Sequence, residues 1–170
     1  MTRPWLATAA VALFLSALAL AAVSCGGGEP SRDDRAGRDF EVREAITSAL
    51  ENDRAIDEAA ATVIESAKAG AEPLGAALDR FVDQTKSLLA VIASVSAPAE
   101  PSDRRLAKAR ELTAEYLRNR VHQVELALSA ASPAELEALY AQVKVDIAAD
   151  RDEIVKLLLS YDPQLEQFIR

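Results

Sequence analysis

Apolar residues recur at intervals of three and four along most of this 170-residue chain. That spacing places them on one face of an α-helix, because the helix repeats every 3.6 residues. Proline and glycine, which interrupt helices, divide the pattern into four blocks. The blocks cover about residues 39–69, 74–96, 103–131 and 133–161. The sequence therefore predicts an all-α fold.

Specific residues mark the ends of these helices. Gly70 follows the first block as a C-cap candidate, and Pro73 opens the second block, where a missing amide proton is tolerated. Ser102 is expected to cap the third helix. The strongest signal is Ser132-Pro133-Ala134-Glu135, which joins an N-cap serine, a proline at the first helical position and the glutamate of a capping box. Asp162-Pro163 is expected to end the fourth helix and start a short one.

The predicted helices are expected to pack as an antiparallel up-down-up-down four-helix bundle over residues 39–170. Each helix has one apolar stripe to bury, and short connections make consecutive helices antiparallel neighbours. A domain of roughly 130 residues is large enough for a real core. The alternative is a pair of helical hairpins that completes its core against a second copy, which would make the protein a homodimer.

The first 25 residues have a different character. A basic start with Arg3, an apolar stretch from about Leu6 to Val23 and small residues before Cys25 form the three parts of an export signal. The sequence Ala22-Val23-Ser24-Cys25 resembles the lipobox of bacterial lipoprotein precursors. The resemblance implies that residues 1–24 are a signal peptide removed on export. It also implies that Cys25, the only cysteine, is lipidated and becomes the first residue of the mature protein.

A lipoprotein of this kind would be anchored in the bacterial cell envelope, facing away from the cytoplasm, by acyl chains such as palmitate on Cys25. Two or three such chains hold a protein firmly on a membrane. Gly26 after the cysteine favours the outer membrane, if the organism has one. Residues 25–38, rich in glycine and charge, are predicted to form a flexible tether of about 20 Å. The alternatives are an uncleaved membrane-spanning helix and ordinary cleavage that leaves a free thiol.

Two carboxylates interrupt the apolar stripes, Asp53 in the first block and Asp150 in the fourth. An ionised carboxylate is not tolerated alone in a dry core, so each needs a partner. Counting residues from the turns places both at about the same level, with Thr85 on the second helix and Thr113 or Tyr116 on the third. The sequence therefore predicts a buried polar layer, with the members Asp53, Thr85, Thr113 and Asp150.

This layer has two alternative roles. In the structural role, Arg54, Arg120 or Arg151, or the nearby hydroxyl groups, hold the carboxylates and fix how the helices align. In the binding role, Asp53 and Asp150 hold a divalent metal or a small cationic ligand, since carboxylate oxygens suit hard cations. A third outcome is that one aspartate is simply exposed to solvent.

Composition argues against several classes of protein. Without residues 1–24 the chain has 27 acidic and 18 basic residues, so its net charge is about −9 and nucleic acid is a poor partner. It has no Glu-x-x-His motif, of which a di-iron bundle needs two, and its one histidine, His122, is expected on the solvated face. Glycine-rich phosphate loops are absent from the sequence. We therefore expect no catalytic residues, no metal and no cofactor.

These observations predict a non-catalytic domain that acts through its surface as an adaptor, scaffold or accessory subunit with a protein partner in the envelope. The alternative is a sensor or carrier that binds a divalent metal or small cationic ligand through Asp53 and Asp150. An enzyme is the least favoured of the three classes.

Overall fold

The computed structural model of the protein describes residues 31–169, apart from the side chains of residues 143–148, 168 and 169. Every regular element in this range is helical, which confirms the predicted all-α fold. The elements are α1 (Arg32–Lys68), α2 (Leu74–Ser96), α3 (Arg104–Ala127), α4 (Pro133–Tyr161), the 3₁₀ turn η1 (Pro163–Leu165) and α5 (Glu166–Ile169). None of these helices has the length and apolar character that crossing a bilayer requires.

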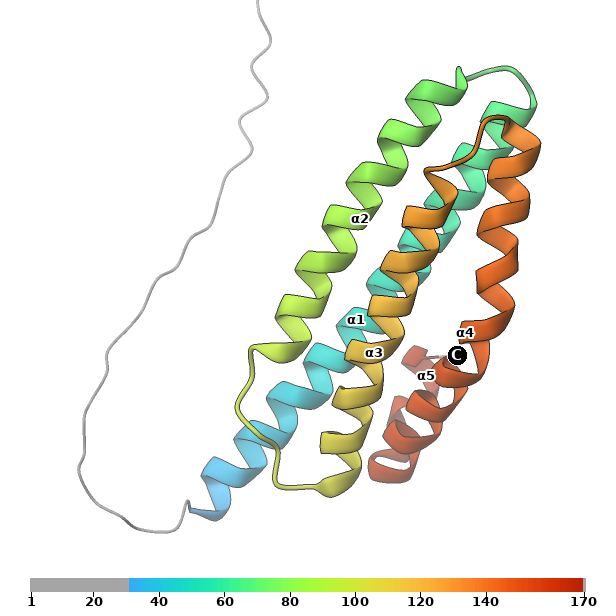
Figure 1. The fold of residues 1–170 in the computed structure, drawn as a ribbon. Coiled ribbons are helices and arrows are strands. Elements are labelled where there is room, and N and C mark those ends of the chain that lie inside the picture. Colours follow the sequence, from blue (N-terminus) through green and yellow to red (C-terminus); the bar gives the residue numbers. More distant parts are fainter. Residues whose placement is uncertain (1–30, 170) are drawn as a thin grey trace, which may run out of the picture.

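The four long helices lie side by side (Figure 1). The connection from α1 to α2 and that from α3 to α4 lie at one end, which we call the Gly70 end. The start of α1, the connection from α2 to α3 and the last turns of α4 lie at the other, which we call the Ser31 end. Two ion pairs join the helices at these ends: Lys68 Nζ lies 2.9 Å from Glu137 Oε1, and Arg43 Nη1 lies 3.1 Å from Asp162 Oδ2.

Helix α1 begins at Arg32, which corrects the expected boundary between a tether at 25–38 and a helix from residue 39. The cause is a capping box: Ser31 Oγ accepts the amide hydrogen of Asp34, and Asp34 Oδ2 accepts that of Ser31, both at 3.1 Å. The first turns are exposed on all sides, so they need no apolar stripe. The predicted signal peptide, Cys25 and residues 25–30 of the tether lie outside the described residues.

The remaining boundaries are close to those predicted. Helix α2 follows Pro73, which is its N-cap and not its first residue. At the start of α4, Ser132 Oγ accepts the amide hydrogen of Glu135 at 3.2 Å, as expected for this cap. The Glu135 carboxylate accepts a hydrogen bond from the amide of Ala131, one residue earlier than a standard capping box requires. Gly70 has a φ of +69° after α1, the left-handed conformation expected of a C-cap glycine.

Asp103 and not Ser102 caps α3. Its Oδ1 accepts the amide hydrogen of Arg105 at 2.7 Å. The amide of Ser102 donates instead to Asp39 Oδ1 on α1, at 2.5 Å. The serine is thus held by a distant carboxylate, which the local sequence could not reveal.

The apolar faces of the long helices form one core, in which most side chains are aliphatic. Phe81 of α2 and Tyr140 of α4 meet edge to face inside it, with ring centroids 5.6 Å apart. The largest fully buried apolar side chains are Phe81, Ile46, Leu50, Leu88, Leu106, Leu117, Leu136, Ile154, Leu158 and Val42. Among the described residues, Arg120 is the largest fully buried side chain, and it defines the candidate site.

Candidate functional site

A cluster of polar side chains lies within the apolar core between α1, α3 and α4. We call it the Arg120 cluster, and its members are Asp53 and Asp57 of α1, Tyr116, Arg120 and Gln123 of α3, and Tyr140 of α4. Helical spacing assembles it, since the three α3 members follow one another at intervals of four and three residues on one face.

Arg120 is the centre of the cluster and is only 2% exposed. Its Nε donates to Asp53 Oδ1 at 2.7 Å, and its Nη1 donates to the side-chain oxygen of Gln123. Its Nη2 donates to the Tyr140 hydroxyl at 3.0 Å and to Asp57 Oδ1 at 3.3 Å. Each guanidinium nitrogen therefore has an acceptor, which is the condition under which a buried arginine is tolerated.

Both carboxylates of the cluster also accept hydrogen bonds. Asp53 accepts from Arg120 on Oδ1 and from the Tyr116 hydroxyl on Oδ2, at 2.5 Å. Asp57 Oδ1 accepts from the Tyr140 hydroxyl at 2.9 Å, and its side chain is 27% exposed. One guanidinium thus lies between two carboxylates, and the excess negative charge is on the side nearer to solvent.

The surroundings keep the phenols neutral and the guanidinium charged. Burial raises the pKa of Tyr116, and the charge of Asp53 raises it further. Burial also raises the pKa of Tyr140, although nearby Arg120 acts in the opposite direction. For Arg120 itself burial acts to lower the pKa, but the charges of Asp53 and Tyr140 and the hydrogen bonds to both together outweigh it, so the pKa is raised. The two phenols are therefore neutral and the guanidinium is charged throughout the neutral range.

The structure differs from the predicted polar layer at three of its four positions. Asp53 is buried and belongs to the cluster. Thr113 is buried, but its hydroxyl donates to the Ala109 carbonyl at 2.7 Å. The hydroxyl of Thr85, which is half-buried, donates to the Phe81 carbonyl at 3.1 Å. Threonines in helices often bond to the carbonyl one turn earlier, and these two therefore do not reach Asp53.

Asp150 is half-buried, and among the described residues it contributes no hydrogen bond to the Arg120 cluster. Helix geometry explains its position. Tyr140 and Leu158 are both buried and are five turns of about 3.6 residues apart. On that spacing the inward position falls between Asp150 and Arg151, so Asp150 lies at the edge of the buried face. Arg151 is near enough to act on the pKa of Tyr116, lowering it slightly against the larger effect of burial.

The sequence indicates Arg120 as one of three candidate partners for Asp53, but Gln123, Asp57 and Tyr140 were not predicted as members of the cluster. A signal for Gln123 exists on α3. Polar side chains occupy its inward face at Thr113, Tyr116, Arg120 and Gln123, and a polar run at this spacing indicates a buried network. Asp57 follows Asp53 by one helical turn, so it could have been placed beside the same partner.

The arrangement offers little to a metal ion. Among the side chains of residues 31–142 and 149–167, no group of three or more His, Cys, Asp or Glu could hold one. Both oxygens of Asp53 already accept hydrogen bonds. His122 is exposed on α3, on the solvated face where the sequence placed it.

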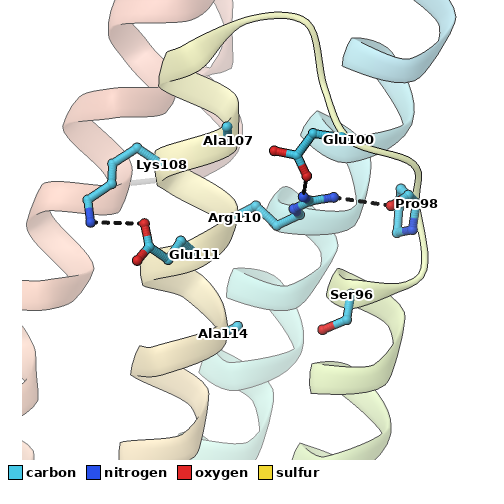
Figure 2. A pocket seen from close by; sticks show the side chains of 8 residues that line it. All are labelled: Ser96, Pro98, Glu100, Ala107, Lys108, Arg110, Glu111 and Ala114. Atoms are coloured by element: carbon cyan, nitrogen blue, oxygen red, sulfur yellow. Dashed lines mark hydrogen bonds and ion pairs between the residues drawn. The ribbon is translucent and has the colours of Figure 1, made fainter.

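A surface hollow of about 670 Å³ lies between the end of α2 and the first half of α3. Figure 2 shows the side chains that line it. Both cationic side chains in its lining are already bound to groups of the same chain. Lys108 Nζ donates to Glu111 Oε2 at 3.1 Å, while Arg110 donates to the Pro98 carbonyl at 3.1 Å and contacts Glu100. The lining therefore contains mutually paired charges and no arrangement of nucleophile and base.

No protein family, curated protein or solved structure matches the chain. The proposed function therefore depends on the chemistry of the described residues. Its main feature is a polar cluster whose donors and acceptors are bound to one another inside the core.

Proposed function

We propose that the protein is a lipid-anchored lipoprotein of the bacterial cell envelope, whose helical domain acts through its surface as an adaptor, scaffold or accessory subunit. The observation that carries this proposal is the closure of the Arg120 cluster. The three guanidinium nitrogens and both Asp53 oxygens bind groups of the same chain. We therefore assign the Arg120 cluster a structural role. On this proposal the protein contacts other molecules through its surface.

We further propose that the domain is an antiparallel up-down-up-down four-helix bundle. Contacts between distant residues support this arrangement. The start of α1 pairs with the end of α4 through Arg43 and Asp162, and the end of α1 pairs with the start of α4 through Lys68 and Glu137. The start of α1 also meets the start of α3, where Asp39 accepts the Ser102 amide hydrogen. The buried apolar residues of the four long helices form one core within a single chain. This favours the bundle over a pair of hairpins that needs a second copy to complete its core.

The anchor rests on the sequence Ala22-Val23-Ser24-Cys25 and its resemblance to a lipobox. In this proposal residues 1–24 are removed, Cys25 carries the lipid, and the domain faces away from the cytoplasm, at the outer membrane if the organism has one. A site for a divalent metal or cationic ligand at Asp53 and Asp150 is not proposed, because Arg120 and Tyr116 occupy Asp53.

The anchor can be tested by labelling cells with radioactive palmitate and comparing the natural protein with Cys25→Ser. We expect label only in the protein with Cys25. Trp5 gives a second readout, because it is the only tryptophan and lies in the segment to be removed. Mature protein should lack indole fluorescence, and mature protein that retains Trp5 and no label would contradict the anchor.

The adaptor role can be tested by crosslinking in intact cells, followed by capture of the protein from detergent-solubilised membranes. We expect a defined envelope partner that is recovered with the natural protein and lost with Cys25→Ser, because the variant is no longer held at the membrane. A protein that stays monomeric and uncrosslinked in its own membrane would contradict the role.

A further inference from the structure

Acidic and basic residues are distributed unevenly along the length of the molecule. Three segments form the Ser31 end, and they contain nine basic and ten acidic residues: 31–44, 98–111 and 156–169. The rest of the described chain contains eight basic and sixteen acidic residues, in 45–97 and 112–155. Nearly all the net negative charge therefore lies away from the Ser31 end.

Contacts between the three segments make the Ser31 end one connected surface. Asp39 of α1 accepts the amide hydrogen of Ser102 at 2.5 Å. Arg105 of α3 donates to the carbonyl of Ser160 on α4, also at 2.5 Å, and stacks over the Tyr161 ring at 5.4 Å. The balanced charge therefore belongs to a defined end of the fold and not to separate loops.

This end is also the one nearest to Cys25 in the chain. Only five residues lie between Cys25 and Ser31, and even a fully extended chain over that stretch spans at most about 20 Å. A lipid on Cys25 would keep the Ser31 end within that distance of the membrane, and the opposite end has no such restriction.

We propose that the Ser31 end lies against an anionic lipid surface, with the long helices standing away from it. The inference rests on the lipid anchor proposed above. If the helices lay flat on the membrane, exposed carboxylates such as Glu58 and Glu125 would come within the Debye length of about 8 Å and be repelled by anionic headgroups. If the helices stand upright, only the Ser31 end, whose charges are nearly balanced, comes within that distance of the headgroups. Phe40, which is 54% exposed, and Arg104 then face the headgroups.

The orientation can be measured by energy transfer from a single fluorophore on the lipidated full-length protein, reconstituted in vesicles with acceptor-labelled headgroups. Ala99→Cys in the connection from α2 to α3 and Ala71→Cys in that from α1 to α2 are a matched pair, since both alanines are exposed at opposite ends. Lipidation consumes Cys25, so each variant offers one thiol. The two positions flank α2, whose 23 residues span roughly 35 Å.

In vesicles of phosphatidylcholine with phosphatidylglycerol, we expect strong transfer from position 99 and little from position 71. High salt, vesicles of phosphatidylcholine alone, or Glu58→Gln with Glu125→Gln should raise transfer from position 71, because each weakens the repulsion. Equal transfer from both positions in anionic vesicles, or a difference unaffected by salt, would overturn the orientation. Protein that does not float with vesicles would overturn the anchor and the orientation together, whereas equal transfer from floating protein overturns the orientation alone.

Discussion

Arg120 on α3 donates its Nε hydrogen to Asp53 Oδ1 on α1 at 2.7 Å, and both side chains are at least 95% buried. Removing one partner of such a pair strands the other charge in the core. The stability of the fold should therefore depend on the two residues jointly.

Arg120→Met should lower the free energy of unfolding by about 3–5 kcal/mol, the usual cost of breaking a buried ion pair. Denaturant unfolding followed by circular dichroism measures it. Arg118→Met on the exposed face of α3 is the matched control and should change stability by about 0.5 kcal/mol or less. The double variant Asp53→Leu with Arg120→Met should lose less free energy of unfolding than the two single variants lose in sum. Strictly additive losses would show that the pair is not coupled.

Tyr116→Phe should lower the free energy of unfolding by about 1–3 kcal/mol, because Asp53 Oδ2 loses its donor in a buried position. Tyr161→Phe is a suitable control, since it keeps the ring that stacks against Arg105. The same denaturation measurement separates the two variants. A loss for Tyr161→Phe as large as that for Tyr116→Phe would argue against a specific role of the Asp53 contact.

Alkaline pH should destabilise the fold through its buried phenols. Burial raises the pKa of Tyr116 and of Tyr140 above the ordinary value of 10.0. The unfolded chain then releases these protons at lower pH than the folded one, so the stabilisation is complete below about pH 10 and is lost as the pH rises above it. Absorbance at 295 nm should show little tyrosinate in the folded protein at pH 10.5 and much more in denaturant. Equal tyrosinate in both states would contradict the burial.

Two glycines should respond to alanine in opposite directions. Gly70→Ala should destabilise by about 1–2 kcal/mol, because a φ of +69° strains any residue with a Cβ although nothing lies within 4 Å of the added atom. Gly37→Ala should stabilise by about 0.5–1 kcal/mol, because Gly37 lies inside α1 with open space around it. Thermal unfolding measures both changes, and a shift of the same sign in both would refute this explanation.

The sequence predicted the helices well wherever local signals decide the outcome. Pro73 and the Ser132 cap fix the starts of α2 and α4, and Asp162-Pro163 ends α4 as expected. The start of α1 was missed because the Ser31 capping box extends a helix into residues without an apolar stripe. A search for apolar periodicity alone cannot find such an extension.

The candidate site was predicted only in part, because its members depend on small rotations of each helix. Asp53 is in the core and Asp150 is at its edge, although both interrupt an apolar stripe in the sequence. Gln123 joins the cluster through the side chain of Arg120 and the main-chain oxygen of Tyr140. The polar spacing on α3 marks Gln123 as a candidate, but its contact with Tyr140 follows from the packing of α3 against α4 and has no local pattern.

The capping box at Ser31 determines where a soluble version of this domain should be cut. A fragment that starts at residue 37 would lose the serine and Asp34, and Asp39 would then lie in a fraying first turn. Because Asp39 holds the amides of Ser102 and Asp103, loosening that turn would also release the connection between α2 and α3. Recombinant fragments should therefore retain Ser31, and those that begin later should be cut more readily by proteases within residues 97–103.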